Sequence, residues 1–134
     1  MNEINTTTTL PALRISRSDH ERLRLLVEAM GNTRPQLRES LQPLKVELER
    51  AEVLAPADVP PHVVKMGSRI ELEDRETGEV DTYSLVYPED ADAAVGKVSV
   101  MAPIGMAVIG FAEGDTFSWK TPGGIRRLLI RKVS

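Results

Sequence analysis

Cysteine is absent from the 134-residue chain, which excludes a disulfide framework, a cysteine nucleophile and a thiolate metal site. The absence fits a reducing compartment, although many secreted domains also lack cysteine. No run of about 18 apolar residues occurs, so we expect no membrane-spanning helix and no membrane partner. The first residues have neither the basic nor the apolar segment that begins a secretory signal, which predicts a cytoplasmic protein.

Aromatic residues are also scarce, at 4% of the chain. They are Tyr83, Tyr87, Phe111, Phe117 and Trp119. An aromatic-lined ligand pocket or a base-stacking platform is hard to build from so few rings. The remaining composition, 41% hydrophobic and 28% charged, is typical of a soluble globular protein with one domain or a small domain and a short appendage.

Charge is distributed unevenly along a chain whose formal net charge is −3. Residues 71–92 hold nine acidic side chains and one arginine, whereas residues 97–134 hold six basic and two acidic side chains. A sheet built from both regions would have a polarised surface; the alternative is two ordinary solvated faces. The pairs Arg126–Arg127 and Arg131–Lys132 could touch phosphate, but without interleaved aromatics we expect no sequence-specific binding to nucleic acid.

The first segment with helical periodicity starts after residue 16. Ser18 and Glu21 form a capping-box pattern, and Gly31–Asn32 is a typical helix end, so we expect a helix between them. Its apolar stripe consists of Leu23, Leu26, Val27 and Met30. We expect residues 1–9 to be a frayed terminus and residues 10–16 to be a short extended segment.

A second helix follows closely. Thr33–Gln36 predicts a short helical turn, and Ser40 resembles an N-cap with Pro43 in the first turn. The apolar positions Leu41, Leu44, Leu48 and Ala51 form a seam that faces the first stripe. The two helices therefore predict a short antiparallel hairpin that must dock on another part of the chain. The seam could instead bind a second copy, but one chain satisfies it more simply, so we expect a monomer.

Prolines at positions 56, 60 and 61 predict a stiff linker over 56–62, between a tail and hairpin at 1–55 and a C-terminal domain at 63–134. The hydrophobic period then becomes two. Strands are expected over 68–73, 80–87, 98–101, 116–120 and 125–133, with a short helix from Pro103 that Gly110 closes. The predicted fold class is α+β: a short N-terminal antiparallel helical hairpin followed by a curled five-stranded antiparallel sheet packed on a short helix.

Side chains suited to catalysis are not grouped in the sequence. His20 and His62 lack neighbours at metal-ligand spacing, which favours solvated or capping histidines. Nothing apolar flanks the carboxylates to raise a pKa, so we expect them to face solvent: Glu71, Glu73, Asp74, Asp90 and Asp92. The glycines Gly105, Gly110 and Gly114 are spaced like turn and cap glycines, not like a phosphate-binding loop. We therefore predict no catalytic, cofactor-binding or metal-binding residues, and a protein that is not an enzyme.

Residues 98–110, the turn at Gly114–Asp115 and residues 119–124 resemble the C-terminal domain of bacterial Gre transcript-cleavage factors. A strand, a helix that starts at proline, a closing glycine, a Gly-Asp turn and a Thr-Pro-Gly-Gly turn follow in the family's order. The resemblance covers about residues 63–134 and implies an FKBP-like domain. The whole chain is still more similar to the Rnk family of Gre-like regulators of nucleoside diphosphate kinase. The segments that carry this likeness are 47–51, 60–64, 66–69, 85–88 and 99–103.

The resemblance implies a transcription regulator that binds core RNA polymerase near its secondary channel, affects nucleoside diphosphate kinase levels and at most binds DNA weakly. By the same likeness, the polymerase contact would be Met101, Ala102, Pro103 and Ile104. For Pro103 the alternative is a purely structural role at the first position of a helix.

The tip of the hairpin departs from the Gre pattern. Gre factors stimulate transcript cleavage with an acidic pair on a long coiled coil, which helps to hold a metal ion. Here the arm is short and its tip has Arg34, Arg38 and a single acid, Glu39. We therefore expect no stimulation of cleavage. The alternative function, an FKBP-like prolyl isomerase or chaperone, needs an aromatic-lined pocket that this sequence can hardly supply.

Overall fold

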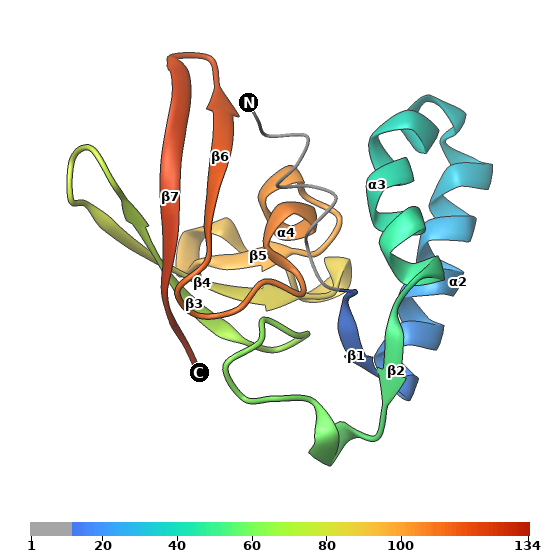
Figure 1. Ribbon diagram of the computed structural model, residues 1–134. Coiled ribbons are helices and arrows are strands. Elements are labelled where there is room, and N and C mark those ends of the chain that lie inside the picture. The colour runs from blue at the N-terminus through green and yellow to red at the C-terminus, as the bar shows by residue number, and fades with distance from the viewer. Residues whose placement is uncertain (1–11) are drawn as a thin grey trace.

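The computed structural model describes residues 12–134, so the predicted frayed terminus at 1–9 and the start of the extended segment lie outside the described residues. The chain folds into a helical hairpin beside a curled sheet (Figure 1). The N-terminal elements are β1 (Arg14–Ser16), α2 (Arg17–Thr33), a 3-10 turn at Pro35–Leu37, α3 (Arg38–Glu49) and β2 (Glu52–Leu54). The sheet contains β3 (Arg69–Asp74), β4 (Val80–Val86), β5 (Lys97–Ser99), β6 (Thr116–Thr121) and β7 (Gly124–Val133), and α4 (Pro103–Val108) packs on it.

The hairpin has the predicted apolar seam. α2 and α3 lie side by side and antiparallel (Figure 1). The buried side chains are Leu23 and Val27 from α2 and Leu41, Leu44 and Leu48 from α3. Leu26, Met30 and Ala51 are partly buried against the same core. The three-and-four spacing therefore identified the packed face of both helices.

The predicted start and end of α2 were wrong. Ser16, not Ser18, is the N-cap, and its hydroxyl oxygen accepts a hydrogen bond from the Asp19 N–H at 3.3 Å. Ser16 ends β1, so its backbone is extended, as an N-cap requires, whereas Ser18 is already helical. The helix also continues past Gly31 to Thr33, and the Arg34 N–H closes it on the Met30 carbonyl at 2.9 Å.

The predicted start of α3 was also wrong. The 3-10 turn runs directly into the helix, so Leu37 already has near-helical backbone angles and no side chain caps α3. Ser40 lies inside the helix, and its hydroxyl donates to the Leu37 carbonyl at 2.9 Å. Pro43 is likewise inside the helix, not in its first turn. A helix that continues directly from a preceding 3-10 turn needs no capping residue. The prediction of Ser40 as an N-cap was wrong for this reason.

The described part of the predicted extended segment at 10–16 contains β1, but sequence patterns did not predict β2 or its pairing with β1 at the base of the hairpin. β1 and β2 pair in parallel, with Ile15 opposite Val53. The Glu52 N–H also donates to the Leu13 carbonyl at 2.8 Å. Parallel strands need a long crossover connection, and here the whole hairpin is that crossover. The pairing of two three-residue strands so far apart in the chain carries no local signal.

The five-stranded sheet is curled but mixed, which corrects the prediction of an antiparallel sheet. Its strand order is β5-β4-β3-β7-β6, and all neighbours are antiparallel except β4 and β5, which are parallel. Between them, 3-10 turns at Pro88–Asp90 and Ala93–Val95 carry the chain back, so that β5 starts beside Ser84 and runs in the same direction as β4. A tight turn would have reversed the direction, but this longer connection does not.

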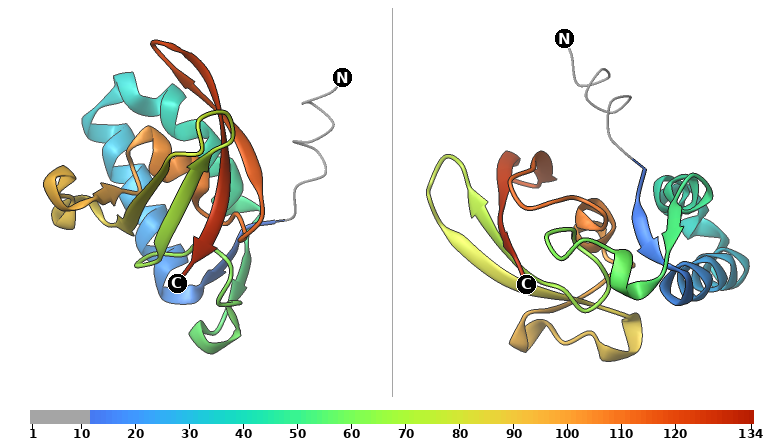
Figure 2. Two further views of the ribbon diagram at one scale, coloured as in Figure 1. Left: turned by 90° about the vertical axis from the view of Figure 1, so that its left-hand side faces the viewer. Right: turned by 60° about the horizontal axis from the view of Figure 1, so that its bottom comes forward.

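One continuous core joins the hairpin to the sheet. Alternate residues of β3 and β7 point inward, among them Ile70, Leu72, Leu128 and Ile130, and α4 covers this inner face (Figure 2). Leu13 and the hairpin seam belong to the same buried cluster. Val59 in the predicted linker is buried, and just after the linker Val64 joins the core, where its N–H donates to the Phe111 carbonyl at 2.8 Å. The FKBP-like character of the sheet stays a prediction.

Candidate functional site

The predicted contact residues form one continuous segment, the turn after β5 and the first two residues of α4, which we call the Met101–Ile104 turn. The Met101 N–H donates to the Ser99 hydroxyl oxygen, and the Ala102 N–H donates to the Ser99 carbonyl, both at 3.0 Å. Pro103 is the first residue of α4, where its missing N–H is harmless, and its side chain is exposed. The other three residues, Met101, Ala102 and Ile104, are partly buried. The turn is therefore held by the side chain and the carbonyl of Ser99, and it exposes Pro103.

Gly105 sets the position of this turn. A Cβ on Gly105 would lie 2.2 Å from the Ser99 carbonyl oxygen and 2.9 Å from the Val100 Cα. The residue is buried in α4, so the prediction of a turn or cap glycine was wrong for Gly105. It was correct for Gly110 and Gly114, whose φ angles are +86° and +98°. Only glycine lets α4 approach β5 so closely.

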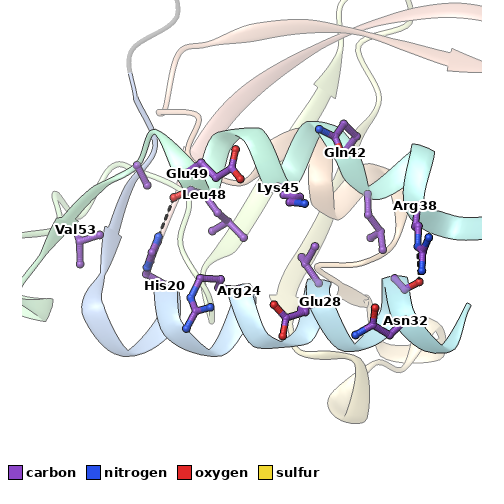
Figure 3. A pocket seen from close by; sticks show the side chains of 14 residues that line it. His20, Arg24, Glu28, Asn32, Arg38, Gln42, Lys45, Leu48, Glu49 and Val53 are labelled. Carbon is purple, nitrogen blue, oxygen red and sulfur yellow. Dashed lines mark hydrogen bonds between the residues drawn. The ribbon is translucent and has the colours of Figure 1, made fainter. Parts of the chain in front are cut away.

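The hairpin tip carries the three predicted charged residues. Arg34 and Glu39 are exposed beside the 3-10 turn that joins the helices. Arg38 folds back, and its Nε donates to the Gly31 carbonyl at 2.9 Å (Figure 3). Two arginines and one glutamate at this end supply no pair of carboxylates for a metal ion.

A groove of about 530 Å³ follows the outer side of the hairpin between α2 and α3 (Figure 3). Its apolar floor includes Val27, Leu41 and Leu48, and its rim mixes Arg24 and Lys45 with Glu28 and Glu49. Sequence reasoning did not find this groove, because the seam pattern gives no measure of the space between the helices. Alternating charges on the rim favour no particular ligand charge.

His20 acts as a capping residue at one end of the groove. Its Nε2 lies 2.8 Å from the Leu48 carbonyl oxygen, in the last turn of α3. The Leu48 carbonyl also accepts from the Ala51 N–H at 3.4 Å, so His20 adds a second hydrogen bond at the end of α3. This agrees with the capping role considered for His20. His62 is exposed, and its carbonyl accepts from the Glu113 N–H at 2.9 Å.

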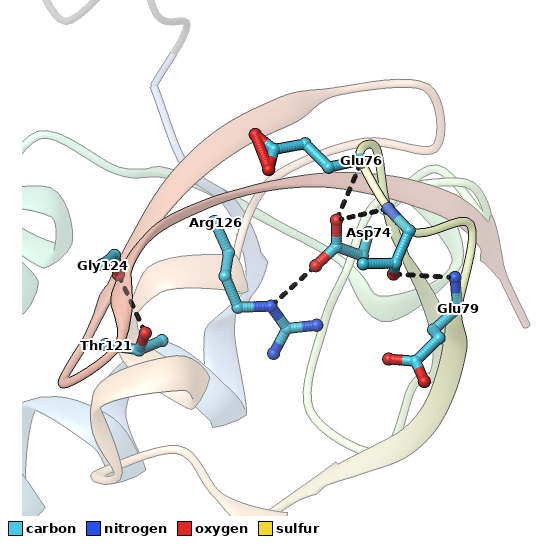
Figure 4. Close-up of polar contacts among 7 residues, drawn as sticks. Asp74, Glu76, Glu79, Thr121, Gly124 and Arg126 are labelled. Carbon is cyan, nitrogen blue, oxygen red and sulfur yellow. Dashed lines mark hydrogen bonds and ion pairs between the residues drawn. The ribbon is translucent and has the colours of Figure 1, made fainter.

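Asp74 is a buried carboxylate at the end of β3, which corrects the prediction that it faces solvent. It accepts hydrogen bonds from the backbone N–H groups of Glu76 and Thr77 and from the Nε of Arg126, the last at 2.9 Å (Figure 4). These donors, the Glu76 N–H first, lower the pKa of Asp74 below its ordinary value of 3.8. A carboxylate held ionised in this way is a poor proton acceptor, so its role is to fix the β3–β4 turn against β7.

The other carboxylates of the acidic region lie nearer the surface. Asp90 and Asp92 are exposed as predicted, whereas Glu71 and Glu73 are half-buried. Glu71 lies 3.8 Å from Arg131, across the β3–β7 pairing. Over residues 12–134, no three histidine, aspartate or glutamate side chains gather closely enough to hold a metal ion.

Two absences apply to the described part of the chain alone. None of its helices is long and apolar enough to cross a membrane. The gap between α4 and the sheet, where Ile104 and Val108 meet Tyr83 and Leu85, measures about 10 Å³. That is room for at most one water molecule, not for a proline ring. This part of the sheet therefore lacks the pocket that a prolyl isomerase needs.

Both the N-terminal and the C-terminal part of the chain match known protein families. Residues 59–134 match the family "Transcription elongation factor, GreA/GreB, C-term", and residues 11–54 match the family "Rnk N-terminus". The "Regulator of nucleoside diphosphate kinase" of Escherichia coli K12 is 35% identical over 115 residues, which are 86% of this chain and 82% of the relative. The transcription elongation factor GreA of Syntrophobacter fumaroxidans is 34% identical over 79% of this chain and 68% of its own length.

Solved structures agree with these matches. A prokaryotic transcription elongation factor GreA/GreB from Nitrosomonas europaea superposes with a TM-score of 0.78 at 38% identity, over 93% of this chain and 99% of that one. The GreA homologue Gfh1 of Thermus thermophilus, at 23% identity and a TM-score of 0.50, shares the fold only. The chain therefore belongs to the GreA/GreB-like transcription factors and, within them, to the Rnk family.

Proposed function

We propose that this protein is a regulator that binds RNA polymerase near its secondary channel, does not stimulate transcript cleavage and affects the level of nucleoside diphosphate kinase. The observation that carries the proposal is the joining of an Rnk N-terminus to a GreA/GreB C-terminal segment in one chain. The name of the Escherichia coli relative supports the link to nucleoside diphosphate kinase. The C-terminal part at 63–134 docks on the polymerase, and the hairpin within 1–55 reaches the neighbouring surface.

The turn at Met101–Ile104 is suited to be the contact. Hydrogen bonds to Ser99 fix the backbone of the turn. The close approach of Gly105 to Ser99 and Val100 fixes the position of the turn relative to β5. A contact surface that is already ordered loses little conformational entropy on binding. Exposed Pro103 and its partly buried neighbours supply apolar area that a partner can cover.

The experiment is crosslinking of the purified protein to core RNA polymerase, with competition by a Gre factor. We expect a crosslink that the Gre factor displaces. Ala102→Asp places a charge in the contact and should weaken binding by more than about 1 kcal/mol, or about fivefold in Kd. Ala91→Asp is the matched control, because Ala91 is exposed and lies outside the turn. An Ala102→Asp protein that folds and binds normally shows that the contact lies elsewhere.

A further inference from the structure

The side chain of Tyr87 joins the sheet to the hairpin. Tyr87 follows the last residue of β4 and is only 8% exposed. Its hydroxyl donates to Asp19 Oδ1 in the first turn of α2 at 2.7 Å, across 68 positions of sequence. A buried hydroxyl needs a partner, and here the partner lies in the other half of the chain.

Arg22, one helical turn beyond Asp19, forms a cation–π contact with the same ring. Its guanidinium carbon lies 3.5 Å from the centre of the Tyr87 ring, and its Nη2 forms an ion pair with Glu89. Asp19 and Arg22 share one face of α2, while Tyr87 and Glu89 flank Pro88 at the end of β4. We call these four residues, Asp19, Arg22, Tyr87 and Glu89, the Tyr87 latch.

The hydroxyl is the decisive part of the latch. Burial, followed by the hydrogen bond to Asp19, raises the pKa of Tyr87, so the hydroxyl keeps its proton and remains a donor at neutral pH. Its bond to a carboxylate is charge-assisted and therefore strong. The Arg22–Glu89 pair is weaker, because both side chains are more than half exposed, at 51% and 59%.

The Tyr87 latch lies at the start of α2, at the opposite end of the hairpin from its tip. From Asp19 to Arg34, α2 and the start of the tip extend about 22 Å at 1.5 Å per residue. A rotation of about 10° at the base would therefore move the tip by about 4 Å. The apolar core also joins the hairpin to the sheet here, and the Tyr87 latch adds directional polar contacts at the start of α2.

From this geometry we propose that Tyr87 is a positioning residue, which holds the hairpin at the angle where one RNA polymerase meets both the tip and the Met101–Ile104 turn. The inference rests on the proposed function. Two contact surfaces on one rigid body bind more tightly than either alone, and this gain is lost when the geometry no longer matches. Breaking the latch should therefore weaken polymerase binding without touching either surface.

The first test measures the hairpin angle in the free protein. Since the chain has no cysteine, Gln36→Cys at the tip and Ser118→Cys on β6 give a unique pair of exposed sites for spin labels. Tyr87→Phe keeps the ring under Arg22 but removes the hydroxyl, and it should shift or broaden the distance distribution between the labels. Tyr83→Phe, which removes the hydroxyl of the chain's other tyrosine, on β4, is the matched control and should change nothing. A Tyr87→Phe distribution that equals the wild-type distribution overturns the proposal.

The second test uses substitutions at the acceptor. Asp19→Asn retains a carbonyl oxygen and should keep the wild-type distances, whereas Asp19→Leu removes the acceptor and should match Tyr87→Phe. Equal distributions for Asp19→Asn and Asp19→Leu would contradict a latch based on this hydrogen bond.

The third test measures polymerase binding. Tyr87→Phe should raise the Kd of the full chain about tenfold, because the second contact no longer engages at the same time. Weaker binding with an unchanged distance distribution would mean that the hydroxyl touches the polymerase directly, which overturns a positioning role. If the wild-type protein does not bind polymerase at all, the proposed function fails, while the label distances still decide whether the latch exists.

Discussion

Leu13 closes directly over Gly110: a Cβ built on Gly110 would lie 2.5 Å from Leu13 Cδ1. Leu13 immediately precedes β1, and Gly110 follows α4 with a φ of +86°. The Gly110 N–H donates to the Val64 carbonyl at 3.0 Å, which fixes the turn beneath Leu13. Leu13, just before β1, thus packs directly on a glycine of the C-terminal part. This contact helps to join the two parts into one core.

This contact predicts the effect of Gly110→Ala. The alanine would have an unfavourable positive φ and would press on Leu13, at a combined cost of about 2 kcal/mol or more in the free energy of unfolding. Chemical denaturation measures the loss. Gly78→Ala is the matched control, because Gly78 has a similar φ of +79° but nothing within 4 Å of its Cβ position. Equal losses in the two variants would show that the contact with Leu13 is unimportant.

The hairpin seam predicts a large effect of Leu48→Ala. Leu48 is 3% exposed, so removing its side chain leaves a cavity and should cost about 2–5 kcal/mol of stability. Val46→Ala, two residues earlier on the same helix, is the comparison, because Val46 is 41% exposed and should lose far less. A loss below about 0.5 kcal/mol for Leu48→Ala would mean that the helices do not pack as described.

Asp74 predicts a specific dependence of stability on acid. Its folded-state pKa lies below 3.8, so near and below that pH the unfolded chain binds more protons than the folded one. The stabilisation by Asp74 is therefore fully present above the unfolded pKa and is lost as the pH falls through the folded pKa. Asp74→Asn should be less stable than the wild type at neutral pH, and the difference should shrink in strong acid. Denaturation curves from about pH 7 to about pH 2 measure this, with exposed Asp90→Asn as the control. A gap that does not change with pH would contradict an ionised Asp74.

We predict that the protein does not stimulate transcript cleavage. α2 has 17 residues, about 25 Å at 1.5 Å per residue, and its tip presents Arg34 near Glu39 where metal ligation would need paired carboxylates. Shortening of labelled nascent RNA in backtracked complexes measures the activity, with a Gre factor as the positive control. The double variant Arg34→Asp, Arg38→Glu corrects the charge but not the reach, and should remain inactive. Cleavage above the intrinsic rate of the polymerase by the wild-type protein would refute the prediction.

Local patterns sufficed for much of the fold. Apolar spacing identified the buried faces of both hairpin helices, and alternation located all five strands of the sheet within a few residues. Turn chemistry placed Pro103 at the start of α4 and Gly110 after its end. Such features are readable because each depends on residues fewer than about eight positions apart, where helix and strand periodicities act.

Contacts between distant segments were not readable in this way. The parallel pairing of β1 with β2, the direction of β5 and the burial of Asp74 each depend on a neighbour supplied by another part of the chain. The same is true of Tyr87, whose sequence neighbours give no sign of Asp19 or Arg22. Periodicity specifies which face of an element is apolar, but not which face of another element covers it. That choice is made by the packing of the whole chain, because burial and hydrogen-bond partners are properties of the assembled core.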